Sequence, residues 1–188
     1  MTKKDPAEII KNDGITVLPT DTLYGICASP FSKKAVEKIY TIKGRDENKP
    51  FIILIDSIQQ LKKFGITVTK EQKTFLQTIW PNPLTVVLPI SSKKFAYLHR
   101  GTNALAFRIP KKKALLELLK KTGPLVAPSA NPQGEKPATT VREAKAYFGN
   151  TVDFNMAGGR KVGKPSTIIE LDAKGKHLVL RPGAFKVK

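Results

Sequence analysis

Short apolar runs alternate along the chain with longer segments in which apolar residues recur every three or four positions. The short runs are rich in β-branched and aromatic residues, which favour buried strands. They cover residues 15–18, 51–55, 84–88, 105–108, 125–127, 167–171 and 178–180. Because these runs alternate with amphipathic segments, the pattern predicts an α/β domain with a mixed sheet.

The amphipathic segments carry helix start and stop signals. Ser32 is a good N-cap for a helix that ends at Gly44, where a left-handed C-cap costs glycine nothing. Thr69 and Gln72 have the spacing of a capping box, and Pro81 stops the helix that follows. Further helices are predicted over 57–64, 114–121 and 140–148, and an irregular basic loop between the strands at 84–88 and 105–108.

The size and continuity of the chain predict one domain over residues 1–188. With 40% hydrophobic residues the chain can bury a substantial core, and it contains no repeat or linker that would divide it. It has no apolar run long enough to cross a membrane, and Met1–Lys11 lacks the apolar centre of a secretory signal. We therefore expect neither membrane anchoring nor export.

Cysteine and histidine are scarce. A lone Cys27 excludes an internal disulfide and is expected to pack in the core. Trp80 is expected in the core or in a cavity wall, not as a base-stacking platform. With His99 and His177 as the only histidines, both in polar segments and expected to be exposed, a Cys/His zinc site has too few ligands. These residues indicate a protein of the reducing cytoplasm.

The charge balance points to an anionic partner. Lys and Arg number 33 against 15 Asp and Glu, so the formal net charge is +18. Nucleic acid, nucleotide phosphates and an acidic protein all fit such a surface, and lysine enrichment can also serve solubility alone. Composition does not choose among these.

Two polar segments follow predicted elements near the N-terminus. Thr20 and Thr22 come directly after the first strand, where open sheets build ligand sites, although both could simply cap their own turn. Lys43 and Arg45 flank a glycine at a helix C-terminus. One cation would suffice to cap the helix, so two strong donors could clamp phosphate or carboxylate oxygens.

Two further segments lie in the second half of the chain. Ser129 and Asn131 follow a strand, and in an extended loop their spacing would direct both side chains into one pocket. Gly158–Gly163 supplies flexible backbone before Ser166. Neither GxxxxGK[ST] nor GxGxxG occurs in a strand-turn-helix context, which disfavours the common nucleotide-binding folds.

Taken together and in order, these segments resemble the YrdC-like family of L-threonylcarbamoyladenylate synthases, in its short single-domain form. The resemblance extends from about residue 7 to 185. It rests on seven motifs: PTDTLYG (19–25), KxR (43–45), WPNPLT (80–85), FRIP (107–110), APSAN (127–131), ST (166–167) and LRPG (180–183).

The resemblance implies a strongly twisted mixed β-sheet with flanking helices and a basic concave cavity. The implied reaction joins L-threonine, bicarbonate and ATP into threonylcarbamoyl-AMP and pyrophosphate, for the threonylcarbamoyladenosine modification of tRNA. Mg²⁺ would be held mainly through substrate oxygens, with no metal site in the protein. The implied partners are the downstream tRNA threonylcarbamoyl-transfer proteins.

The resemblance also assigns roles to individual residues. The catalytic and ATP-binding residues are Lys43, Arg45, Ser129 and Asn131, with Arg181 against the nucleotide. The threonine-binding residues are Thr20, Thr22, Arg108 and Ser166.

Two other functions stay open. One is a non-catalytic RNA-binding or ribosome-associated paralogue of the same fold, which would have no need to keep Lys43, Arg45, Ser129 and Asn131 together. The other is a carbamoyl-transfer domain that accepts a different amine. The basic surface would also allow weak, salt-dependent tRNA binding, for which the solvated triplet Lys111–Lys113 is the expected contact.

Overall fold

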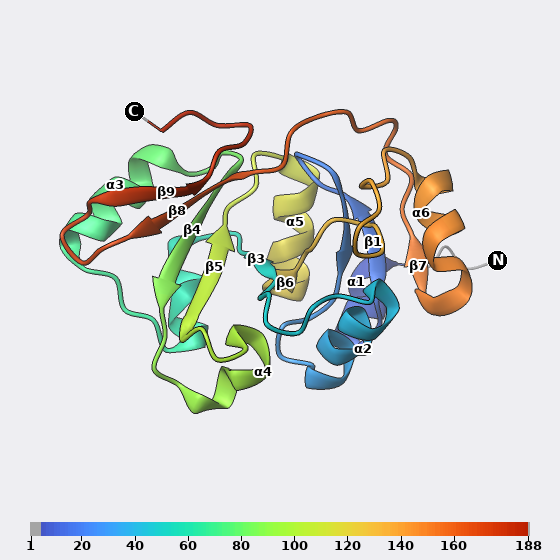
Figure 1. The fold of residues 1–188 in the computed structure, drawn as a ribbon, viewed down its shortest axis with the longest axis horizontal. Coiled ribbons are helices and arrows are strands. Elements are labelled where there is room, and N and C mark those ends of the chain that lie inside the picture. The colour runs from blue at the N-terminus through green and yellow to red at the C-terminus, as the bar shows by residue number, and fades with distance from the viewer. Residues whose placement is uncertain (1–4, 188) are drawn as a thin grey trace.

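Two β-sheets form the framework of the computed structural model, which describes residues 5–187 (Figure 1). The charged N-terminal segment before Asp5 lies outside the described residues. The smaller sheet has the strand order β2 (Tyr24–Cys27), β1 (Thr16–Pro19) and β7 (Phe154–Asn155). The larger has the order β6 (Leu125–Val126), β3 (Ile52–Leu54), β5 (Ala104–Arg108), β4 (Leu84–Pro89), β8 (Thr167–Leu171) and β9 (His177–Arg181).

Both sheets are mixed, which confirms the α/β class. Parallel pairs β1–β7, β3–β5 and β4–β8 stand beside antiparallel neighbours. The expected single sheet is divided in two, and the two parts meet at isolated bridges between Gly25 and Ser129 and between Ala28 and Val126. Two predicted ligand-binding loops therefore lie against each other where the sheets join.

Helices flank both sheets. The α-helices are α1 (Pro6–Lys11), α2 (Lys33–Lys43), α3 (Lys70–Ile79), α4 (Ala96–His99), α5 (Lys113–Thr122) and α6 (Val141–Phe148). Shorter 3₁₀ segments are η1 (Ile58–Phe64), η2 (Lys93–Phe95) and η3 (Gly149–Thr151). In the part of the chain that is described, no helix is long and apolar enough to cross a membrane.

The hydrogen bonds of the structure confirm the predicted helix caps. Ser32 accepts the amide proton of Ala35, and Gly44 ends α2 with φ of 56°. Thr69 and Gln72 form a reciprocal capping box on α3. The segment predicted as a helix over 57–64 is a 3₁₀ helix, and Gly65 closes it in the left-handed region.

Six elements escape the sequence pattern: α1, β2, η2, α4, η3 and β7. Strand β2 pairs with β1 after a four-residue turn, in a segment that the sequence assigns to a loop followed by an apolar stretch. The predicted irregular loop between β4 and β5 contains η2 and α4. His99, at the end of α4, is 7% exposed and accepts the Gly101 amide, so its expected exposure is wrong.

The core lies between the six-stranded sheet and the helices behind it. Phe64 packs against Phe107 of β5 with ring centroids 5.1 Å apart, and Trp80 is buried. A second cluster joins α1 and α5 to both sheets and contains Cys27, which is fully buried as expected. With one face of the large sheet covered in this way, the opposite face is left to form a site.

Candidate active site

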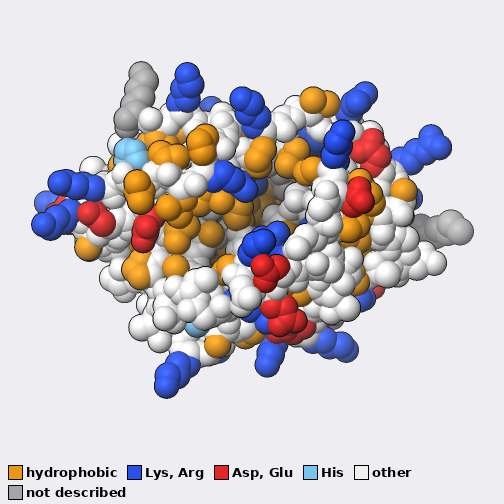
Figure 2. Space-filling model, viewed as in Figure 1, with side chains coloured by type: hydrophobic (Ala, Val, Ile, Leu, Met, Phe, Trp, Pro, Cys, Tyr) orange, Lys and Arg blue, Asp and Glu red, His pale blue; other side chains and the backbone are white. Residues whose placement is uncertain are grey.

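A cavity of about 770 Å³ opens over the uncovered face of the large sheet and reaches the loops of the small one (Figure 2). Seven of the nine predicted site residues line it: Thr20, Thr22, Arg45, Arg108, Ser129, Ser166 and Arg181. Its apolar floor includes side chains from β3, β4, β5 and β8, namely Ile52, Val87, Ala106 and Ile168. The sequence motifs therefore converge on one cavity.

The cavity wall is basic. Its cations are Arg45, Arg108, Lys136, Lys161 and Arg181, and no Asp or Glu is among the lining residues. Low-dielectric walls with charges of one sign raise the local concentration of counter-charged ligands. The cavity is thus suited to polyanions. Lys136 and Lys161 lie outside the motifs, so sequence analysis does not find them.

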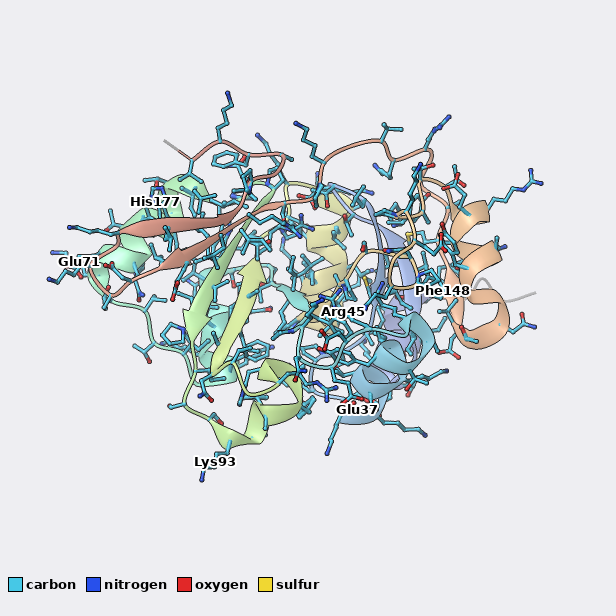
Figure 3. The ribbon with its side chains drawn as sticks, viewed as in Figure 1. Glu37, Arg45, Glu71, Lys93, Phe148 and His177 are labelled. Atoms are coloured by element: carbon cyan, nitrogen blue, oxygen red, sulfur yellow. The ribbon has the colours of Figure 1, made fainter. Side chains whose placement is uncertain are left out.

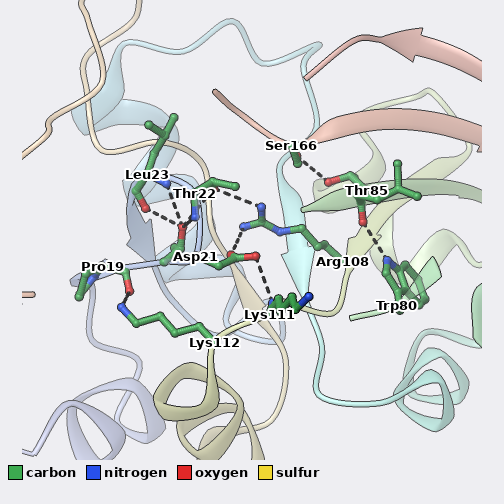
Figure 4. Close-up of polar contacts among 12 residues, drawn as sticks. Pro19, Asp21, Thr22, Leu23, Trp80, Thr85, Arg108, Lys111, Lys112 and Ser166 are labelled. Atoms are coloured by element: carbon green, nitrogen blue, oxygen red, sulfur yellow. Dashed lines mark hydrogen bonds and ion pairs between the residues drawn. The ribbon is translucent and has the colours of Figure 1, made fainter. Parts of the chain in front are cut away.

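The loop after β1 forms its own network (Figure 4). Thr20 Oγ1 donates to the Leu23 carbonyl at 2.6 Å and accepts the amides of Thr22 and Leu23 at 3.2 Å. This is the self-capping turn that the sequence left open as an alternative for Thr20. Thr22 instead accepts a hydrogen bond from Arg108 Nη1 at 3.2 Å, which links the loop to the large sheet.

Arg108 is held by Asp21, as Figure 4 shows. Its Nη2 lies 3.2 Å from Asp21 Oδ1, and the two side chains are 5% and 6% exposed. The other carboxylate oxygen accepts the backbone amide of Lys111 at 3.1 Å. Burial lowers the pKa of Arg108 and the charge of Asp21 raises it. Asp21 is a site residue to which the sequence motifs assign no role, although its carboxylate lies inside PTDTLYG.

Arg45 and Arg181 carry uncompensated charges. Arg45 lies between the two sheets (Figure 3), where its Nε donates to the Lys49 carbonyl at 3.1 Å and its guanidinium sits 5.4 Å from the Phe51 ring centre. Arg181 donates to the Ser166 carbonyl at 2.7 Å. Burial and the charge of Arg45 both lower the pKa of Arg181. Within residues 5–187 neither guanidinium has an ion-pair partner, so an anionic ligand would relieve both.

Lys43 lies behind the cavity wall and is 3% exposed. Its Nζ donates to the carbonyl of Ser129 at 2.6 Å and to that of Asn131. Burial, and then the charge of Arg45, lower the pKa of Lys43 to about 7. Lys43 therefore holds the backbone of the Ser129–Asn131 loop through these two hydrogen bonds.

Ser129 and Asn131 do not share an orientation. Ser129 lines the cavity, whereas the Asn131 amide nitrogen donates to the carbonyls of Pro132 and Glu135 at 2.9 and 2.8 Å. Asn131 Oδ1 is buried without a partner. Two hydrogen bonds within its own loop turn the Asn131 side chain away from the direction that the extended spacing predicts.

The glycine-rich segment is fixed by Tyr24. The Tyr24 hydroxyl accepts the Gly158 amide at 2.9 Å and donates to the Gly159 carbonyl at 2.8 Å. Farther along, Ser166 Oγ lies 2.9 Å from Thr85 Oγ1. A Cβ on Gly183 would come within 2.5 Å of the backbone beside Ser166, which explains why the turn after Arg181 needs glycine.

Lys112 differs from its neighbours in the basic triplet. Its Nζ donates to the Pro19 carbonyl at 2.6 Å, and the side chain is partly buried (Figure 4). Lys111 and Lys113 are exposed. The expectation that the whole triplet is solvated is wrong for Lys112, because this lysine braces the loop that carries Thr20 and Thr22.

Comparison with known proteins decides the family. The Sua5/YciO/YrdC profile, described as "Telomere recombination", matches residues 8–183. The chain belongs to the Sua5/YciO/YrdC family. This confirms the resemblance drawn from the motifs.

Family members with curated names are about one-third identical. The threonylcarbamoyl-AMP synthase of Pyrococcus abyssi is 31% identical over 97% of this chain and 54% of its own length. The enzyme of that name from Methylobacillus flagellatus is 34% identical over 86% of this chain and 91% of its own. The chain spans about half the length of the Pyrococcus relative and of one from Bacillus subtilis.

Solved structures of the family share the fold. Pyrococcus abyssi Sua5 in complex with L-threonine superposes with a TM-score of 0.86 at 32% identity, covering 94% of this chain and 52% of that one. Escherichia coli YciO gives a TM-score of 0.83 at 25% identity, covering 97% and 89%. The single α/β domain seen here is therefore the fold of the family.

Proposed function

We propose that the protein is a threonylcarbamoyl-AMP synthase and that one domain, residues 1–188, carries the reaction. The observation that carries the proposal is the convergence of seven motif residues on one basic cavity. The names of the Pyrococcus and Methylobacillus relatives support it, as does the L-threonine complex of the Pyrococcus protein. The substrates are L-threonine, bicarbonate and ATP.

ATP occupies the part of the cavity that Arg45, Ser129 and Arg181 line. The two guanidinium groups lack counter-ions, and phosphate oxygens match their planar donors. Lys43 acts through the Ser129–Asn131 loop, whose carbonyls it holds. Lys136 and Lys161 add charge at the same cavity.

Threonine lies at the part of the cavity formed by Thr22, Arg108 and Ser166. Arg108 offers a cation to the threonine carboxylate, and its pairing with Asp21 keeps the guanidinium in place. Thr20 shapes the turn that presents Thr22. This division puts the amino acid beside the loop of β1 and the nucleotide beside the Ser129–Asn131 loop.

The chemistry needs positioning more than a nucleophilic side chain. The threonine amine attacks bicarbonate with loss of water and gives a carbamate. A carbamate oxygen then attacks the α-phosphorus of ATP, and pyrophosphate leaves. Several anionic groups meet in this sequence, so the fixed cations of the wall offset their repulsion and stabilise the charge on the leaving group.

Magnesium does not fit a cage built by the protein. The described residues contain no group of three or more His, Cys, Asp or Glu side chains that could hold a metal, and the cavity lining has no carboxylate. We therefore place any Mg²⁺ on the phosphate oxygens of ATP, with water completing its shell.

The product would be passed to proteins that transfer the threonylcarbamoyl group to tRNA in the cytoplasm. Weak tRNA binding by the basic surface is part of the same proposal. The competing assignment, a non-catalytic RNA-binding paralogue, predicts RNA binding without adenylate formation.

The direct experiment is incubation of the protein with labelled bicarbonate, ATP, Mg²⁺ and each amino acid in turn, followed by chromatography. A labelled adenylate that forms with threonine alone is the expected result. Formation with another amine would assign the protein to a different carbamoyl transfer. Absence of any adenylate would favour the RNA-binding alternative.

A further inference from the structure

Strand β9 forms an open edge of the large sheet. It pairs with β8 on one side, and within residues 5–187 no strand pairs with its other side. An unpaired edge presents backbone donors and acceptors in a row, and proteins usually protect it with charged residues, proline or a covering element. Here the centre of the strand carries Leu178, Val179 and Leu180.

These three side chains are exposed by 62%, 45% and 51%. Pairing with β8 slips by one residue between Val179 and Arg181, a bulge that disturbs the alternation of side chains along β9. The three exposed side chains therefore form one apolar row, which the bulge does not cover. Apart from Phe31 and Val162, they are the only large hydrophobic residues of the described chain that are exposed. Packing does not account for such a row, whereas an interaction surface does.

The start of β9 is packed against α3. His177, at its start, stacks on Phe75 of α3 with ring centroids 5.3 Å apart, and Figure 3 shows His177 beside that helix. Thr69 Oγ1 donates to the Ala173 carbonyl at 2.8 Å, which ties the β8–β9 turn to the same helix. At the other end Arg181 lines the cavity. The edge thus extends from the α3 contact to the cavity rim.

The charge around β9 indicates which kind of ligand could bind its open edge. Segments 70–79 and 170–187 together hold six Lys and Arg against three Asp and Glu. A second copy would bring two chains of +18 together, which disfavours self-pairing. Apolar side chains on both faces do not suit a phosphate backbone. The matching ligand is an extended segment with acidic and apolar residues.

We propose that β9 is a docking strand for a partner protein, which adds an extended acidic segment to the sheet edge. Backbone pairing supplies affinity, and apolar side chains of the segment pack on the exposed side chains of Leu178 and Leu180. The acidic residues meet Lys174 and Lys176, which are exposed in the turn before β9. A partner bound in this way sits next to the mouth of the cavity. The proposal goes beyond the synthase assignment and does not depend on it.

The test uses the intact protein and a fluorescent ten-residue peptide of alternating Glu and Val, followed by fluorescence anisotropy. Measurable binding that weakens with salt is expected. N-methylation of alternate residues, which removes the backbone donors of one peptide edge, should abolish binding for one edge and spare it for the other. A lysine-for-glutamate version of the peptide should bind at least tenfold more weakly.

Substitutions of exposed residues should leave the fold intact, so they can locate the binding site. The double variant Leu178→Ser and Leu180→Ser should weaken peptide binding at least tenfold. Val162→Ser, which removes an apolar side chain 79% exposed but outside β9, should not. No binding at 1 mM peptide, or binding that ignores the double variant, would overturn the proposal. So would a concentration-dependent dimer or binding to anionic vesicles that the double variant abolishes, because either result would identify a different occupant.

Discussion

Lys43 is the residue whose surroundings change its chemistry most clearly. An ammonium group is normally protonated well above neutral pH, but burial lowers the pKa of Lys43 to about 7. Its Nζ donates to two carbonyls of the loop that carries Ser129. Protonation, loop geometry and ligand charge are therefore coupled at this position.

The coupling predicts a pH dependence of stability. Between the folded pKa of about 7 and the ordinary value of 10.5, the unfolded chain binds more protons at Lys43 than the folded chain does. The free energy of unfolding should therefore rise with pH across this window. Denaturant unfolding at pH 7 and pH 8.5 should show a rise in the wild type that is smaller in Lys43→Met. Equal pH dependence in both proteins would contradict the assignment.

Asp21 and Arg108 give a second prediction at the residue scale. Asp21→Asn leaves a buried guanidinium without its counter-ion, and breaking a buried pair costs about 3–5 kcal/mol of unfolding free energy. Because Arg108 then loses its fixed position, the KM for threonine should rise more than the KM for ATP.

Glu117→Gln is the control for Asp21→Asn. It breaks a pair between two exposed side chains, Lys120 at 60% and Glu117 at 52% exposure, which water screens, so the stability should stay close to that of the wild type. A loss of stability in Asp21→Asn with both KM values unchanged would reduce Asp21 to a structural role.

At the scale of elements, the turn after β9 is what positions Ser166. Gly183 packs against the backbone of Pro165 and Ser166, and Arg181 donates to the Ser166 carbonyl. Gly183 and Arg181 thus both contact the backbone just before strand β8, which begins at Thr167. The polar end of the cavity depends on this close backbone approach.

Gly183→Ala tests that dependence. The new Cβ would lie 2.4 Å from the Pro165 carbonyl oxygen, so the turn must shift, and overpacking of this kind costs about 1–3 kcal/mol. Loss of stability together with weaker threonine binding is expected. Gly163→Ala is the matched control, because its nearest neighbour, the Thr22 carbonyl oxygen, is 3.6 Å away. Comparable losses of stability in the two variants, measured by thermal unfolding, would contradict the account.

The sequence predicts elements well where local signals decide them. The caps of α2 and α3 are made by the predicted residues, because a hydroxyl that satisfies a free amide acts within one turn. Strand β2 is not predicted, because it contains a glycine and follows β1 after a short turn. It is defined by its pairing with β1, which the local sequence pattern does not show. The two-residue β7 is too short to show any period.

In the site too, local motifs are predicted from the sequence and contacts between loops are not. Motif order brings seven residues to one cavity, but the orientation of Asn131 and the bracing by Lys112 depend on hydrogen bonds across loops. Lys136 reaches the cavity from a segment without a recognisable pattern, and Lys161 from the glycine-rich segment 158–163, whose pattern assigns no role to its lysine. Proximity in space, which the sequence does not record, decides these contributions.

At the scale of the whole molecule, the charge of +18 exceeds what one cavity uses. The exposed Lys111 and Lys113 are the part of the triplet free to contact tRNA. Reversing both to Glu, with Lys112 retained, should weaken tRNA binding and reduce its salt dependence while adenylate synthesis is unchanged. Lys33→Glu with Lys34→Glu provides an equal charge change elsewhere. Gel-shift titrations that show no tRNA binding at low salt would remove nucleic acid as a partner.

The central claim is that one cavity joins ATP to a carbamate formed from threonine and bicarbonate. Because adenylate formation is reversible, labelled pyrophosphate should enter ATP when the protein, Mg²⁺, threonine and bicarbonate are all present, and only then. Arg45→Ala and Arg181→Ala should each slow this exchange by about 100- to 1000-fold, the usual effect of losing one donor to developing charge. Exchange that proceeds without threonine, or that both variants leave unchanged, would contradict the account.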